Sequence, residues 1–140
     1  MGSDSALQTI RDDLAFLDDW DDRYRYLIDL GKAMAPLPAE AYSDANKVQG
    51  CASQVWLVSS AEEGPDPVVH FSGDSDAHIV RGLVAIVLAA YDGKRASEAA
   101  KLDATELFSK IGLVEHLSAQ RANGLRSMIR RIREESARFV

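Results

Sequence analysis

Cysteine is almost absent from this sequence of 140 residues, which holds a single one at position 51. One cysteine excludes an internal disulfide framework, and it excludes any metal site built from several cysteines of one chain. Long hydrophobic runs are also missing, because HIVRGLVAIVLAAY is short and Arg81 interrupts it. We therefore expect no membrane span. The opening residues, MGSDSALQTI, lack the basic and apolar regions of a signal peptide, which predicts a cytoplasmic protein.

Glycine-rich phosphate-binding loops are lacking too, since neither G-x-x-x-x-G-K-[ST] nor G-x-G-x-x-G occurs. The net charge of −6 argues against binding to nucleic acid. The charge is uneven, however, because RDDLAFLDDWDDR is acidic and RSMIRRIREESARF is rich in arginine. Both segments are typical of solvated helix faces. The alternative is that one of them binds an oppositely charged protein.

Apolar residues recur at helical spacing near the start of the chain, which predicts helices over about residues 5–17 and 20–34. Asp19 suits the N-cap of the second helix, and Pro36 follows its end. Further along, QVWLVSS and VVHFSG predict the two strands of a hairpin. The segment NKV is a candidate for a short third strand.

The second half of the chain reads as helical. Asp74 or Ser75 suits the N-cap of a helix whose body is apolar on most sides, so this helix is expected in the middle of the core. Asp103 and Glu106 have the spacing of a capping box for a short helix. With 46% hydrophobic residues, we expect one α+β domain over residues 1–140, with a small antiparallel sheet of about three strands flanked by helices. The last helix turns these apolar residues inward: Leu125, Met128, Ile129 and Ile132.

The single cysteine lies in NKVQGCASQVWLV, a small polar segment directly before an apolar run. A thiol reacts as its thiolate, and the pKa of a free cysteine is about 8.5. Gly50 gives the backbone freedom and leaves the approach to Cys51 open. A free cysteine is more often a small buried hydrophobe, but those usually lie within an apolar period. The loop-like surroundings of Cys51 leave both readings open.

Partners for a catalytic thiol are missing from its immediate sequence. His70, His78 and His116 are scattered over a strand, a helix and a loop, and each is expected to be a surface or capping residue. Together with one cysteine they indicate neither a Cys–His dyad nor a metal site. Lys47 and Arg121 would supply positive charge only if folding brings them close.

The cysteine segment NKVQGCASQVWLV resembles the central motif of the SufE family, the sulfur-acceptor proteins of iron–sulfur cluster assembly, which includes CsdE. Three further stretches resemble the family in the same order, and the resemblance runs from about Leu14 to Arg133. Ser118 and Ala119 stand where the family often has threonine and proline. The stretches are WDDRYRYLIDLGKAMAPLP, GDSDAHIVRGLVAIVLAAYDGK and LFSKIGLVEHLSAQRANGLRSMIRRIR.

The resemblance implies a fold shared with the IscU-type scaffolds and a role for particular residues. Cys51 matches the family cysteine that accepts a persulfide sulfur from a pyridoxal-phosphate cysteine desulfurase of the SufS or CsdA type and stimulates that enzyme. Arg121 positions the loop, stabilises the thiolate or acts as a structural cap. Gln54 supports the loop backbone, while Gly50 and Asp74 face the partner. Asp74 has two readings, as a helix cap and as an interaction residue.

The resemblance also implies where the sulfur goes and what shelters it. The recipient is a cluster-assembly scaffold such as SufB, and the pyridoxal cofactor belongs to the desulfurase, so neither cofactor nor metal is expected in this chain. We expect Val48, Val55 and the central helix to cover the thiol. Two other classes remain: a regulatory adaptor that carries no sulfur, and an IscU-like scaffold, which one cysteine disfavours.

Overall fold

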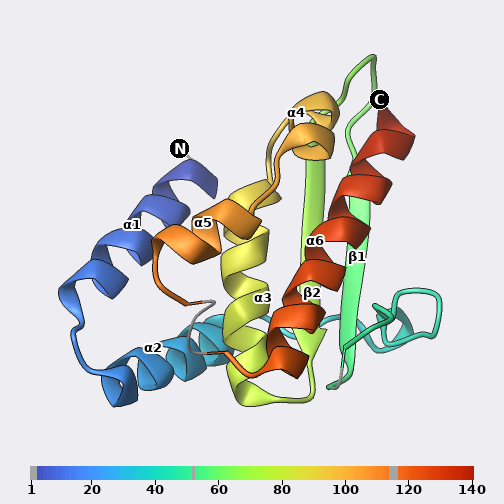
Figure 1. The fold of residues 1–140 in the computed structure, drawn as a ribbon. Helices are drawn as coiled ribbons and strands as arrows, with labels where there is room; N and C mark the ends of the chain where they lie inside the picture. The colour runs from blue at the N-terminus through green and yellow to red at the C-terminus, as the bar shows by residue number, and fades with distance from the viewer. Residues whose placement is uncertain (1–2, 52, 114–116) are drawn as a thin grey trace.

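The computed structural model describes residues 3–51, 53–113 and 117–140, which combine helices with one small sheet (Figure 1). This arrangement confirms the expected α+β class. The elements in chain order are α1 (Ser3–Phe16), α2 (Trp20–Ala33), a 3-10 turn η1 (Ala39–Ala41), β1 (Val55–Ala61), β2 (Val69–Ser75), α3 (His78–Tyr91), α4 (Ala96–Lys101), α5 (Thr105–Lys110) and α6 (Ala119–Phe139).

The sheet among the described residues has two antiparallel strands rather than the expected three. Its register pairs Val55 with Ser75 at one end and Ala61 with Val69 at the other. The NKV segment adds only one isolated bridge, between Lys47 and Trp56. The third-strand prediction was therefore wrong, because the chain leaves the edge of β1 again after this bridge and turns toward α6.

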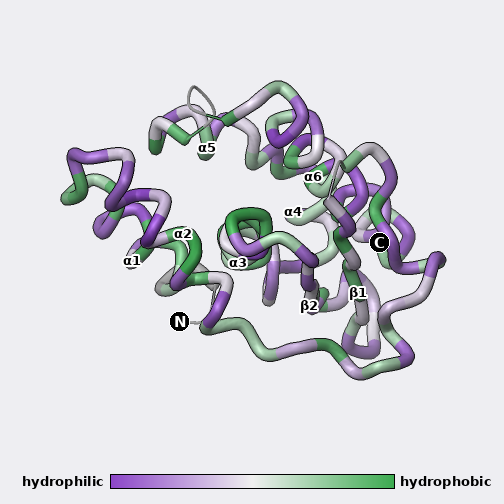
Figure 2. The backbone as a smooth tube through the Cα atoms, turned by 90° about the horizontal axis from the view of Figure 1, so that it is seen from below, coloured by the Kyte–Doolittle hydropathy of each residue, from purple (hydrophilic) through white to green (hydrophobic). Residues whose placement is uncertain are grey.

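Helix α3 lies at the centre of the molecule, as its apolar sequence predicts. Figure 2 shows it surrounded by α1 and α2 on one side, the sheet on another and α6 on a third. Its residues Val84, Ile86, Val87 and Tyr91 have no exposed surface. A helix apolar on most of its faces needs neighbours on most of its faces, and this packing provides them. Of the described helices, none combines the length and the apolarity needed to cross a bilayer.

Small residues let α2 approach α3 closely. A Cβ atom on Gly82 would overlap the backbone carbonyl of Leu27, and one on Gly31 would lie 2.7 Å from the Cβ atom of Arg81. At the start of α2, Asp19 is the N-cap as expected, and its carboxylate accepts a hydrogen bond from the Asp21 N–H at 3.0 Å.

Two predicted caps were wrong. Strand β2 continues through Ser75, so α3 begins only at His78, and its N-cap is Ala77 rather than Asp74 or Ser75. The short helix α5 has Ala104 at its N-cap, and Asp103 accepts instead from the Thr105 N–H. The first error arises because β2 extends through Ser75, whereas at α5 the Asp103 carboxylate lies one residue before the cap and still binds the first N–H of the helix. The short helix α4 was not predicted from the sequence.

Helix α6 runs beside β1 and packs on α3 and α4. Its four predicted inward residues, Leu125, Met128, Ile129 and Ile132, are each at most 3% exposed. The hydroxyl of Ser118 caps its start by accepting from the Arg121 N–H at 3.2 Å. The first turn of α6 lies at the end of the molecule where β1 begins (Figure 1), so this helix passes directly beside the cysteine segment.

Candidate functional site

The cysteine segment packs on the first half of α6. The Cys51 Sγ atom lies 3.6 Å from the Gly124 carbonyl oxygen, and the residue is partly buried. The thiol faces a cavity of about 20 Å³. Lining residues come from the cysteine segment, α3 and α6: Cys51, Ser53, Val80, Leu83, Gln120, Arg121, Gly124 and Met128.

The cover over the thiol differs in part from the expected one. The central helix contributes Val80 and Leu83, as expected, and α6 contributes Met128. Val48 and Val55 are buried in the main core instead and do not line the cavity. Sequence reasoning missed α6 as a wall of this site, although its Gly124 interrupts an otherwise bulky helix face.

Glycines lie on both sides of the contact between the segment and α6. Gly50 has a φ of +89°, a backbone conformation that residues with a Cβ atom rarely adopt. A Cβ atom at position 50 would also lie only 2.6 Å from the Ser127 hydroxyl oxygen. A Cβ atom at Gly124 would sit 3.4 Å from Cys51 Sγ, against the thiol itself. The contact between loop and helix therefore depends on glycine at position 50, whereas a Cβ atom at position 124 would make an ordinary van der Waals contact with the thiol.

The upstream arm of the loop, residues 45–48, is fixed to both the sheet and α6. The Val48 N–H donates to the Val55 carbonyl at 2.8 Å. The Arg131 guanidinium donates to the carbonyls of Ala45 at 2.8 Å and Lys47 at 3.2 Å. Lys47 thus contributes its backbone here rather than a charge beside the thiol. Arg131 was not singled out from the sequence.

The downstream arm is fixed by a pair of residues. Asp76 accepts hydrogen bonds from the backbone N–H of Gln54 at 3.0 Å and from its side-chain amide at 3.4 Å. The Asp76 N–H donates in return to the Gln54 carbonyl at 3.2 Å. Gln54 thus contacts the loop's anchor through both its backbone and its side chain. Asp76 precedes α3 and anchors the loop.

The environment of the thiol favours its protonated form. Burial raises the pKa of Cys51 above its ordinary value, because an apolar cavity stabilises a neutral thiol over a charged thiolate. Arg121 lines the same cavity, and its backbone N–H is used by the cap of α6. In this closed arrangement Cys51 is therefore held as a weakly reactive thiol.

Asp74 lies inside the molecule rather than at the loop. It is 8% exposed, and its carboxylate is 2.8 Å from Arg81 Nε and accepts a hydrogen bond from the Tyr42 hydroxyl at 2.6 Å. Arg81 Nε is buried without a well-aligned hydrogen bond, so charge attraction dominates this contact. The Tyr42 ring also packs edge-on against Trp56 of β1, with ring centroids 5.0 Å apart. This network ties the segment before the cysteine loop to the sheet.

The histidines do not gather at the thiol. His70 contacts Glu62 at 2.8 Å and Asp92 at 3.5 Å, and the hydrogen bond that its ring donates to the Glu62 carboxylate is the main cause that raises its pKa. His78 begins α3, and His116 lies outside the described residues. Within the described ranges, no group of three or more histidine, cysteine or acidic side chains is placed to hold a metal ion.

The fold and site define a class of protein: a small α+β domain that presents one sheltered cysteine on an anchored loop. A family profile described as the Fe–S metabolism associated domain, SufE, matches residues 8–136. The chain therefore belongs to the SufE family, as its cysteine motif indicated, and has the family's association with iron–sulfur metabolism.

Similar proteins agree with this assignment. An uncharacterized SufE-like protein of Rhizobium etli is 65% identical over 133 residues, which cover 94% of this chain and 90% of that protein. Another from Rhizobium meliloti is 62% identical over 133 residues, with 94% and 95% covered. A solution structure of a hypothetical protein from Thermus thermophilus superposes with a TM-score of 0.72 over 97% of this chain and 93% of that chain. At 16% identity it supports the fold alone.

Proposed function

We propose that this protein is a sulfur carrier. Cys51 accepts a sulfur atom from the persulfide of a pyridoxal-phosphate cysteine desulfurase of the SufS or CsdA type, stimulates that enzyme, and passes the sulfur to a SufB-type scaffold. In the accepting step, the Cys51 thiolate attacks the terminal sulfur of the donor persulfide. A new S–S bond forms at Cys51 Sγ, the S–S bond of the donor breaks, and the donor cysteine leaves as a thiolate. Its pyridoxal cofactor stays with the desulfurase.

The observation that carries the proposal is the placement of the thiol in a small cavity on a loop anchored at both ends. A carrier must keep its sulfur away from water-borne oxidants and reductants between two partners. The cavity beside Cys51 Sγ measures about 20 Å³, which exceeds the roughly 10–15 Å³ that one water-sized atom needs. Its apolar walls, Val80, Leu83 and Met128, offer no nucleophile to a sulfur held there.

The same arrangement supports activation by a partner. The raised pKa of Cys51 favours the protonated thiol while the loop lies in its cavity, so the thiol reacts more readily once the loop leaves it. Once Cys51 is exposed, its pKa falls toward its ordinary value and more thiolate is present. A reducing cytoplasm is the compartment in which a lone thiol stays available for this chemistry.

Mass spectrometry of the Cys51 peptide, after incubation with a SufS-type desulfurase and cysteine, tests the proposal. The expected result is a gain of one sulfur atom on Cys51 that a reductant removes. The desulfurase without cysteine is the control, because it holds no sulfur to transfer. Failure of Cys51 to gain sulfur while the desulfurase turns over would refute the carrier role.

A regulatory adaptor is the second candidate, favoured by the anchored loop, which can dock without reacting. Cys51→Ser separates the two functions. The serine variant of a carrier still binds the desulfurase but no longer stimulates it, whereas that of an adaptor keeps its effect. An IscU-like scaffold would instead retain iron or zinc on purification, which metal analysis of the protein measures.

A further inference from the structure

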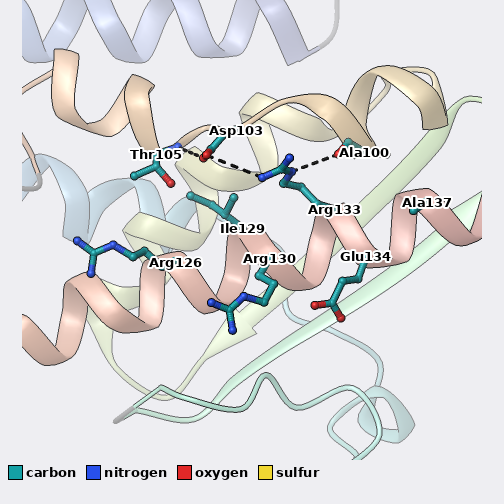
Figure 3. A pocket seen from close by; sticks show the side chains of 9 residues that line it. All are labelled: Ala100, Asp103, Thr105, Arg126, Ile129, Arg130, Arg133, Glu134 and Ala137. Atoms are coloured by element: carbon teal, nitrogen blue, oxygen red, sulfur yellow. Dashed lines mark hydrogen bonds and ion pairs between the residues drawn. The ribbon is translucent and has the colours of Figure 1, made fainter.

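Helix α6 borders a second hollow, separate from the cavity beside Cys51. This cleft of about 450 Å³ runs between α6 and the α4–α5 segment, and it combines arginines with an apolar floor (Figure 3). Its volume is far larger than that of the thiol cavity, but the described residues place no cysteine or histidine in it. Its lining residues are Ala100, Asp103, Thr105, Arg126, Ile129, Arg130, Arg133, Glu134 and Ala137.

The three arginines of the cleft differ in what they contact. Arg133 is used internally, because its Nε donates to the Ala100 carbonyl at 3.2 Å and its Nη1 lies 3.8 Å from Asp103. Arg126 and Arg130 point away from Asp103 in Figure 3. Arg126 contacts the neutral amide of Asn123 at 3.0 Å, and neither guanidinium has an ion pair with a described residue. Two positive charges, one helical turn apart, therefore make no ion pair within the described part of the fold, although Glu134 lines the same cleft one turn beyond Arg130.

These two charges are continuous with the thiol site along the surface. Gln120, Asn123, Arg126 and Arg130 are all exposed and recur at helical spacing along α6. Gln120 also lines the cavity of Cys51. At a rise of 1.5 Å per residue, Gln120 and Arg130 are about 15 Å apart along the helix. A protein contact of about 800 Å² per partner is roughly 30 Å wide, so a protein that reaches Cys51 also covers this stripe.

We propose that Arg126 and Arg130 bind carboxylates of the cysteine desulfurase and orient its approach to Cys51. This inference rests on the sulfur-carrier function. The chain carries a net charge of −6, so an acidic surface is repelled by most of the molecule and attracted by this stripe. Local attraction within overall repulsion selects one docking orientation and raises the association rate.

The test compares association of a SufS-type desulfurase with two doubly substituted proteins. Arg126→Glu/Arg130→Glu reverses the stripe. Arg11→Glu/Arg25→Glu makes the same change in net charge at exposed arginines of α1 and α2, on the other side of α3 (Figure 2). Stopped-flow fluorescence measures the association rate at low and at physiological ionic strength.

Reversing the stripe should lower the association rate constant at low salt about tenfold or more, with a much smaller change in the dissociation rate. The control pair should change association less than about threefold. Added salt should shrink the difference between the two variants, because it screens exposed charges. Arg126→Gln/Arg130→Gln should fall between wild type and the reversed protein, and it replaces the reversed protein if that variant does not fold.

Equal slowing by both double variants would overturn the inference, since net charge alone would then explain the effect, and so would no slowing by either. Alkylation of Cys51 in the isolated proteins should be the same in all variants. If wild-type protein gains sulfur on Cys51 but the stripe has no effect, only this inference fails. If wild-type protein gains no sulfur, the carrier function fails with it.

Discussion

Replacing Gly50 with alanine should release the cysteine loop from α6. The native φ of +89° is unfavourable for any residue with a Cβ atom, and that atom would lie 2.6 Å from the Ser127 hydroxyl oxygen. Both effects act only on the closed loop, because an open loop can adopt an ordinary backbone conformation. The substitution therefore shifts the loop equilibrium toward the open form.

The size of the shift follows from the backbone term. A left-handed conformation costs a non-glycine residue about 1–2 kcal/mol. Destabilising the closed form by that amount raises the open population roughly five- to thirtyfold. Cys51 is only partly buried in the closed loop, so a reagent that prefers the open form should react faster by up to the same factor. The contact with Ser127 adds to this value.

Alkylation of Cys51 by iodoacetamide at neutral pH measures the effect. Gly50→Ala should react roughly five- to thirtyfold faster than wild type. In the double variant Gly50→Ala/Ser127→Ala the steric part is removed and the backbone part remains, so its rate should fall between the two. Ser127→Ala alone should react at nearly the wild-type rate. An unchanged rate in Gly50→Ala would refute the idea that loop closure protects the thiol.

The remaining predictions concern the thiol, its anchor and the buried ion pair. Because burial raises the pKa of Cys51 in the folded state, the thiol stabilises the fold relative to Cys51→Ser at pH values below the ordinary cysteine pKa. This stabilisation is lost as the pH rises through the raised pKa. Denaturant titrations of both proteins across that pH range measure the difference. Asp76→Ala removes two hydrogen bonds from Gln54 and should speed Cys51 alkylation about fivefold. Gln54→Ala keeps the backbone hydrogen bonds and should change the alkylation rate less than about twofold. Equal effects of the two substitutions would contradict the conclusion that Asp76 anchors the loop. Asp74→Ala leaves the buried Arg81 Nε without its counter-charge and should lower the free energy of unfolding by about 3 kcal/mol, which urea denaturation measures. Once the protein is unfolded, thiol titration should give the same reactivity of Cys51 as in unfolded wild type.

Much of the fold could be predicted because its signals are local. The helical spacing of apolar residues indicated α1, α2 and α6, and the all-round apolar body of α3 placed it in the core. The prediction of a helix cap was wrong where a strand extends further than expected, as at Asp74, which lies in β2. A polar residue before an apolar run indicates a helix start only when that residue is not part of a strand. The end of a strand depends on pairing with residues that are distant in the sequence.

The site was predictable in its centre but not in its surroundings. Cys51 and Gln54 are close together in the sequence and belong to one motif. Gly124 and Arg131, which hold the loop in place, lie far along the chain on α6. Neither has a local signature, because a glycine or an arginine in a helix becomes significant only when folding brings another segment against it. The helical periodicity shows which face of α6 is buried, but not which loop covers its edge.

The hydrogen bonds that fix the chain on either side of Cys51 limit how far the cysteine loop can move. With Val48 held by Val55 and Arg131 holding the carbonyl of Lys47, only Gln49 and Gly50 lie between Cys51 and its fixed stem. Three extended residues reach about 10 Å. Under the proposed carrier function, the loop can move a sulfur on Cys51 outward by only about this distance, so the donor would have to present its own persulfide near its surface or extend it toward Cys51.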